Sequence, residues 1–114
     1  MRGSFAHPVF AALVTMTALA TCSVLAQESA ASLRRGQALL TRNCARCHAT
    51  GTAGLSPHPA APPFRTLARK YPIDSLQEAL AEGLSVGHPE MPEFVFEPDE
   101  IGAILAYLKS IQEQ

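Results

Sequence analysis

The chain has 114 residues and a formal net charge of −1. This length fits one domain, and without an excess of basic residues we expect no nucleic-acid partner. No stretch combines strand-like alternation with β-branched residues, so we predict an all-α fold.

The first 26 residues have the pattern of a secretory signal peptide. Arg2 gives a basic start, residues 9–25 are apolar and uncharged, and residues 24–26 resemble a small-residue cleavage site. We therefore predict a signal peptide over residues 1–26 and a mature domain over residues 27–114.

Two other fates of this leader keep the protein at a membrane. Residues 19–22 resemble a lipobox that would lipidate Cys22, although Thr21 departs from the small residue normally found there. The apolar stretch is also close to the length of a membrane span, so it could remain as an uncleaved anchor. Every route exports the domain, and we expect a periplasmic protein without stable membrane insertion unless one of these tethers operates.

The first helix of the mature chain should run from about residue 30 or 32 into the cysteine motif. Leu33, Gly36, Leu40 and Cys44 fall on one face at helical spacing. A glycine inside a helix costs about 1 kcal/mol relative to alanine. Gly36 should therefore have a packing reason.

Residues 44–48 read Cys-Ala-Arg-Cys-His, the attachment signature of a c-type haem. Cys44 and Cys47 lie nearly on one side of a helical turn, so both sulfurs can reach the two vinyl groups of one porphyrin. The next residue, His48, can supply an imidazole ligand to the iron. The motif occurs once, so we predict one covalent haem c per chain.

A pair of cysteines at this spacing has other interpretations. A thioredoxin-like redox pair would follow a strand, whereas the residues before Cys44 are predicted to be helical. A structural zinc site needs four ligands, and outside the leader only the separate His58 and His88 remain. A disulfide across so tight a loop would be strained. Haem attachment is therefore the favoured interpretation.

Two short helices are predicted in the middle of the chain. The first covers residues 64–70. The second follows Asp74 or Ser75, because Ser75 and Glu78 fit a capping box, and it ends at Gly83.

The sixth iron ligand is expected in the loop over residues 84–97. Met91 lies between two prolines in a polar, turn-rich segment, where an apolar residue has little reason to serve as ordinary core. The flanking prolines stiffen the backbone that presents its thioether. His88 in the same loop is the main rival, and His58, in the loop over residues 49–63, is predicted to be a surface residue.

The last helix should run from about Pro98 to Ile111. Proline suits the first helical position, and Asp99 and Glu100 favour the positive end of the helix. Five apolar residues form a continuous stripe, with Tyr107 beside it. The stripe consists of Ile101, Ile104, Leu105, Leu108 and Ile111.

Charge is distributed unevenly along the mature chain. Residues 33–70 contain seven basic residues and no acidic one, whereas residues 71–114 contain nine acidic residues and one basic residue. Solvated faces, with some arginines balancing haem propionates, explain this pattern in one interpretation. In the other, a molecular dipole orients the protein towards a redox partner.

Residues 30–112 resemble the class I monohaem c-type cytochromes of the small bacterial type. In that family a glycine stands eight residues before the first haem cysteine, as Gly36 does here, and the last helix crosses there beside an aromatic residue, which would be Tyr107. The family's methionine ligand is followed by proline, as in Met91-Pro92. The family often has Phe or Tyr where this chain has Leu40.

The resemblance implies a cytochrome c fold, with three to five helices wrapped around one covalently attached haem. It also implies that a proline carbonyl after the haem loop, that of Pro62 or alternatively Pro63, accepts a hydrogen bond from His48. Such a bond would orient the ligand and raise its basicity. Cys44, Cys47, His48, Met91 and Pro62 are thus the expected site residues, with His48 and Met91 on the iron.

The function implied is periplasmic electron transfer between transient redox protein partners, and not an enzymatic activity. One alternative is a haem protein whose Met91 leaves the iron, as in a peroxidase or gas sensor. Another is an electron-transfer subunit of an exported oxidoreductase.

Overall fold

A computed structural model describes residues 27, 29–83 and 89–113. The chain divides into two units, Met1–Ala30 and Ala31–Gln114, and the fold described below is that of the second unit. The predicted signal peptide with Cys22, and also His88, lie outside the described residues.

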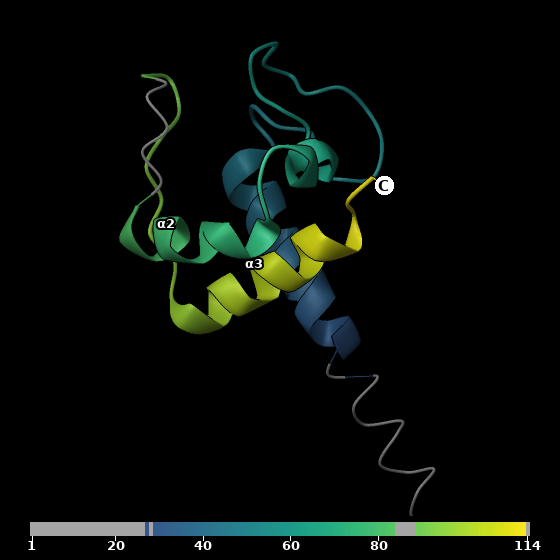
Figure 1. Ribbon diagram of the computed structural model, residues 1–114, viewed down its shortest axis with the longest axis vertical. Helices are drawn as coiled ribbons and strands as arrows, with labels where there is room; N and C mark the ends of the chain where they lie inside the picture. Colours follow the sequence, from purple (N-terminus) through teal and green to yellow (C-terminus); the bar gives the residue numbers. More distant parts are fainter. Residues whose placement is uncertain (1–26, 28, 84–88, 114) are drawn as a thin grey trace, which may run out of the picture. The chain divides into compact units, whose positions relative to one another are not determined.

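The described residues contain helices and no β-strand, which confirms the predicted fold class (Figure 1). No helix within them has both the length and the apolar character needed to cross a membrane. The first helix of this unit covers residues 31–44. The other elements are the 3-10 helices η1 (Phe64–Arg69) and η2 (Ile73–Ser75) and the α-helices α2 (Leu76–Glu82) and α3 (Pro98–Ser110).

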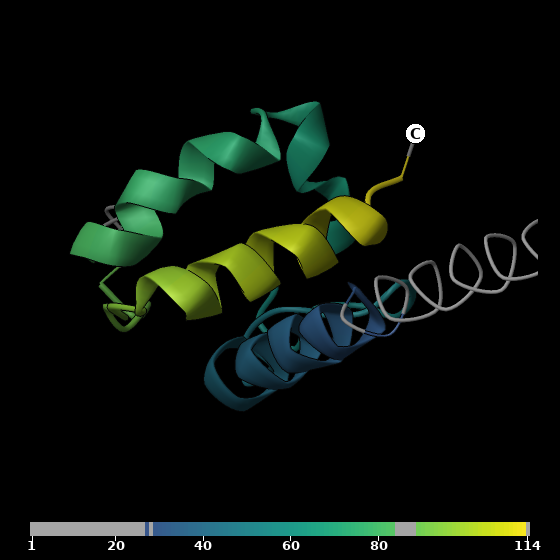
Figure 2. The same cartoon turned by 90° about the horizontal axis from the view of Figure 1, so that it is seen from below.

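The helix α3 occupies the middle of the unit. Figure 2 shows it between the helix of residues 31–44 on one side and α2 on the other. Its apolar stripe is buried, and Ile104 within it is fully inaccessible to solvent. One hydrophobic cluster contains this stripe together with Leu39, Leu40 and Phe64. Burial of these side chains is the main force that holds the helices together.

Gly36 allows the first helix to cross α3 closely, which confirms that this glycine has a packing reason. A Cβ atom at Gly36 would overlap the carbonyl oxygen of Ala103, lie 2.7 Å from that carbonyl carbon and lie 2.9 Å from Cβ of Tyr107. Two of these atoms belong to the backbone and cannot rotate away. A side chain at this position would therefore push the two helices apart.

The start of α3 is capped more fully than the sequence analysis predicted. Pro98 is the first helical residue, as expected, and Glu97 before it is the N-cap. The side chain of Glu97 accepts a hydrogen bond from the backbone N–H of Glu100, and the side chain of Glu100 accepts one from the backbone N–H of Glu97. These two reciprocal bonds form a capping box. This arrangement satisfies backbone N–H groups that the helix itself leaves unpaired.

The predicted capping box at Ser75 and Glu78 is wrong. An N-cap residue has extended backbone angles, whereas Ser75 is helical (φ −64°, ψ −14°) and makes no side-chain cap. The chain turns earlier, after Pro72, and η2 leads directly into α2. Gly83 ends α2 as predicted, at a φ of +103° that favours glycine.

Three ion pairs join the basic first half of the mature chain to its acidic second half. Arg35 lies 2.7 Å from Asp99, Arg65 lies 2.7 Å from Glu113, and Arg69 lies 2.8 Å from the same carboxylate. The charges that are separated in the sequence are thus partly neutralised in the folded unit.

Candidate haem site

The cysteine motif occupies the turn that ends the first helix. The backbone N–H groups of Cys47 and His48 both donate to the carbonyl oxygen of Cys44, at 3.1 and 2.9 Å. This tight turn carries Cys44, Cys47 and His48, and all three residues are half-buried. Both cysteines are thiols and form no disulfide.

The environment of Cys44 favours the neutral thiol. Burial, and secondarily the charge of Cys47, raises the pKa of Cys44 to about 11 from 9.0. Cysteines that act as redox nucleophiles have lowered pKa values and electropositive surroundings. At neutral pH Cys44 therefore keeps its proton, which argues against a thioredoxin-like redox pair.

The imidazole of His48 is held in one orientation and one tautomer. Its Nδ1 atom lies 2.8 Å from the carbonyl oxygen of Pro62. A carbonyl oxygen can only accept, so Nδ1 carries the proton and the lone pair is on Nε2. The ring of Phe64 packs beside the imidazole, with 4.6 Å between the ring centroids. His48 thus presents a nitrogen with the chemistry of a metal ligand.

The loop after His48 is bonded closely to the rest of the unit. Phe64 N–H donates to the carbonyl of Ala49 at 2.9 Å, and Ala49 N–H donates to Oγ of Ser56 at 3.0 Å. The hydroxyl of Tyr107 donates to the carbonyl of Thr50 at 3.1 Å. The Tyr107 bond links the loop directly to α3, so the position of His48 depends on the core.

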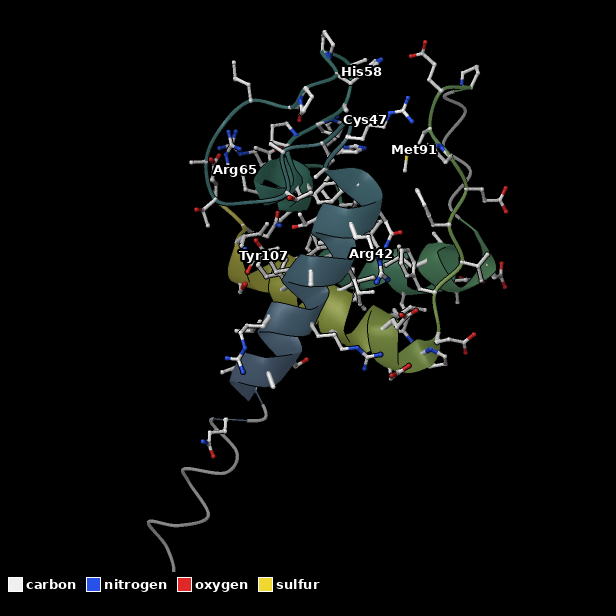
Figure 3. All side chains as sticks on the ribbon, turned by 180° about the vertical axis from the view of Figure 1, so that it is seen from behind. Arg42, Cys47, His58, Arg65, Met91 and Tyr107 are labelled. Carbon is white, nitrogen blue, oxygen red and sulfur yellow. The ribbon has the colours of Figure 1, made fainter. Side chains whose placement is uncertain are left out.

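Met91 lies on a second loop, over residues 89–97, which runs to α3. Figure 3 shows its side chain directed from this loop towards the side on which Cys47 lies. Beyond Met91, the half-buried Phe94 and the buried Phe96 pack against the core, and Phe96 N–H donates to the carbonyl of Leu80 at 2.9 Å. The loop is therefore anchored on the α3 side of Met91.

A cleft of about 470 Å³ opens where the two loops approach each other. Its lining residues come from the cysteine motif, the loop after it and the Met91 loop. They are Arg46, Cys47, Pro57, His58, Pro59, Glu90 and Pro92. Of the predicted haem-site residues only Cys47 lines this cleft, and Glu90 and Pro92 flank Met91 in the sequence. Two cysteines, an imidazole nitrogen and a thioether are nevertheless the donor types that hold a covalently attached haem.

His58 contributes to this cleft in a way that the sequence analysis did not predict. Its Nε2 atom lies 2.8 Å from Oε2 of Glu90, and its side chain is 39% exposed. His58 is thus at the surface, as expected, but it is paired with a residue 32 positions later in the chain. No sequence pattern indicates such a distant pairing.

Comparison with known proteins identifies the family. The family model described as cytochrome C oxidase, cbb3-type, subunit III, matches residues 31–108. Cytochrome c-552 of Bradyrhizobium diazoefficiens is 34% identical over 94 residues, which cover 82% of this chain and 88% of that protein. No solved structure matches.

The chain therefore belongs to the cytochrome c family, within the group that the subunit III model defines. It is a haem-binding electron-transport protein of the all-helical type. The resemblance to monohaem c-type cytochromes, based on the haem motif and Gly36, is confirmed.

Proposed function

We propose that this protein is an exported one-electron carrier with a single haem c. Cys44 and Cys47 would hold the haem through two thioethers, and His48 and Met91 would ligate its iron. The haem, when bound, supplies an iron that gains and loses one electron. The observation that carries this proposal is the hydrogen bond from His48 Nδ1 to Pro62, because it leaves Nε2 available to a metal.

The residues around His48 hold its imidazole ready for ligation. The carbonyl of Pro62 fixes the tautomer and makes Nε2 a stronger donor. Phe64 restricts rotation of the ring from one side. These two contacts hold the imidazole in one place, which favours electron transfer with little rearrangement on this side.

Ligation by Met91 would shift the redox equilibrium towards the reduced state. A thioether ligand favours ferrous iron and so raises the reduction potential. The apolar surroundings supplied by Phe94 and the core also disfavour the additional positive charge of the ferric state. With His48 and Met91 both ligating it, the iron would transfer electrons without binding a substrate.

The location and partners follow from the leader and the charge pattern. Residues 1–26 direct export, and cleavage after Ala26 releases the domain into the periplasm, where c-type haem is attached. The donor and acceptor are redox proteins that bind transiently. The exposed Arg46 at the cleft gives the encounter an electrostatic component.

The test compares three holoproteins by redox titration: wild type, Met91→Ala and Val95→Ala. Val95 is 65% exposed on the same loop, so its variant controls for changes in the loop. We expect a positive midpoint potential for the wild type and the Val95 variant. The Met91 variant should fall by more than about 59 mV, a tenfold change in a one-electron equilibrium, and lose the weak methionine-to-iron absorbance band. A negative wild-type potential, or a band that survives in the Met91 variant, would contradict the assignment of Met91.

A second candidate function is that of an electron-transfer subunit in a stable exported complex. The family description, which names a subunit of an oxidase, favours this candidate. Purification of the native protein at low ionic strength separates the two candidates. A free carrier elutes alone, whereas a subunit elutes with a larger haem- or metal-containing protein.

A further inference from the structure

His58 and Glu90 connect the two loops across the opening of the cleft. Nε2 of His58 lies 2.8 Å from Oε2 of Glu90. His58 belongs to the loop that follows His48, and Glu90 immediately precedes Met91. Within the described residues, no other hydrogen bond or ion pair joins residues 49–63 to residues 89–97.

The backbone at His58 provides a fixed base for this contact. Its N–H donates to the carbonyl of Cys47 at 3.1 Å, and its carbonyl accepts from Ala61 N–H at 3.1 Å. Pro57 and Pro59 flank it, and each has a restricted φ. The imidazole is thus attached to the same backbone segment as the cysteine motif.

The hydrogen bonds of His58 also fix its tautomer. The N–H of Ala60 donates to Nδ1 at 3.2 Å, so Nδ1 is an acceptor and carries no proton. The proton is therefore on Nε2, from which it is donated to the carboxylate of Glu90. This is a charge-assisted hydrogen bond, and it does not require a positively charged imidazole.

We propose that His58 is a positioning residue for Met91. Through Glu90 it holds residues 89–92 at the opening of the cleft and so keeps Met91 directed towards the side of Cys47 and His48. This inference rests on the proposed function, because it assumes that Met91 ligates the iron. An exposed pair of this kind changes the population of molecules with the loop detached by up to about fivefold.

The test uses the holoprotein and two readouts that report on the methionine ligand. These are the rate at which the reduced protein binds carbon monoxide and the intensity of the weak methionine-to-iron band in the oxidised protein. His58→Ala should bind carbon monoxide faster, by up to about fivefold, and show a weaker band. Glu90→Ala should give the same change, and it serves as an independent variant if the first folds poorly.

Two further variants define the mechanism. His58→Gln places an amide N–H donor near Glu90 and should restore the wild-type rate and band. Asp74→Ala removes the ion pair with Lys109, which is 2.6 Å long, similarly exposed and outside the cleft lining. It should leave both readouts unchanged, because loss of an exposed ion pair by itself does not move Met91.

Wild-type rates and band intensities in both His58→Ala and Glu90→Ala would overturn the positioning role. Failure of His58→Gln to restore a defect seen in His58→Ala would also overturn it, because the effect would then not pass through Glu90. Met91→Ala separates this inference from the proposed function. If that variant keeps the band, Met91 is not the ligand; if it loses the band while the His58 and Glu90 variants match wild type, only the positioning role fails.

Discussion

The two sides of the cleft differ in how they are attached to the core. On the His48 side, the imidazole bonds to Pro62, the adjacent Phe64 is buried, and the loop is tied to α3 through Tyr107. On the Met91 side, Phe96 is buried and its backbone bonds to Leu80, but the residues nearer Met91 have only the half-buried Phe94 and the exposed pair of Glu90.

This difference indicates which property each side controls. Substitutions on the His48 side should lower the free energy of unfolding, because they remove buried contacts. Substitutions on the Met91 side should mainly change how firmly the methionine is retained, because that loop depends on few contacts.

The largest difference is expected between two phenylalanines, one on each side. Phe64→Ala removes a buried ring and should lower the free energy of unfolding by about 3–5 kcal/mol. Phe94→Ala should cost less, since part of its ring already faces solvent, but should weaken the methionine-to-iron band more. Chemical denaturation and absorbance of the two holoproteins measure both effects. Equal losses of stability in the two variants would contradict the claim that the His48 side contributes more to stability than the Met91 side.

A pair of glycine variants tests the helix crossing that supports the His48 side. Gly36→Ala places a Cβ against backbone atoms of Ala103 and should destabilise the protein by about 1–3 kcal/mol. Gly102→Ala, in α3, meets nothing within 4 Å and should stabilise it by up to about 1 kcal/mol through helix propensity. Denaturant midpoints at constant slope provide the measurement. A stabilising Gly36→Ala would show that the helices do not cross closely.

The hydroxyl of Tyr107 tests the bond between α3 and the His48 loop. Tyr107→Phe loses the hydrogen bond to Thr50 and should cost about 1 kcal/mol at neutral pH. Burial raises the pKa of Tyr107 above 10.0, so the folded state favours the protonated phenol. The contribution of the protonated Tyr107 hydroxyl to stability is present below pH 10.0 and is lost as the pH rises through the folded pKa.

The free energy of unfolding, measured from about pH 8 to about pH 11, checks this prediction, because this range spans the ordinary pKa of a phenol. The wild type should lose stability relative to Tyr107→Phe at the alkaline end. Burial also raises the pKa of Tyr71, but this residue is present in both proteins and its effect cancels. Parallel curves for the two proteins would contradict the prediction.

The smallest effect is expected at Asp99, which pairs with Arg35 on the first helix. The hydrogen bond from Arg35 is the main cause that holds the pKa of Asp99 below 3.8. Its stabilisation is present above pH 3.8 and is lost as the pH falls through the folded pKa. The effect is small because both side chains are exposed. As the pH falls, the stability of the wild type should therefore decrease slightly more steeply than that of Asp99→Asn. A steeper decrease in the variant would contradict this prediction.

Features encoded by neighbouring residues could be predicted from the sequence. The first helix and α3 follow from apolar residues at helical spacing and from Pro98. The cysteine motif specifies its chemistry within five residues. Gly36 could be identified because a glycine inside a helix needs a reason, and the structure provides one at Ala103.

Features that depend on distant residues could not be predicted in this way. The capping box at Ser75 failed because Pro72 starts the turn three residues earlier, which local preferences for serine do not reveal. The bond from Tyr107 to Thr50 spans 57 positions, and the pairing of His58 with Glu90 spans 32. Both exist only because the helices bring the loops together.

The central claim is a single haem fastened to Cys44 and Cys47, and intact-mass spectrometry of the purified, denatured holoprotein tests it most directly. The account predicts one species whose mass equals the exported polypeptide plus one haem. A Cys44→Ala, Cys47→Ala double variant should show the polypeptide mass alone. A wild-type protein that shows the polypeptide mass alone after denaturation would contradict the account.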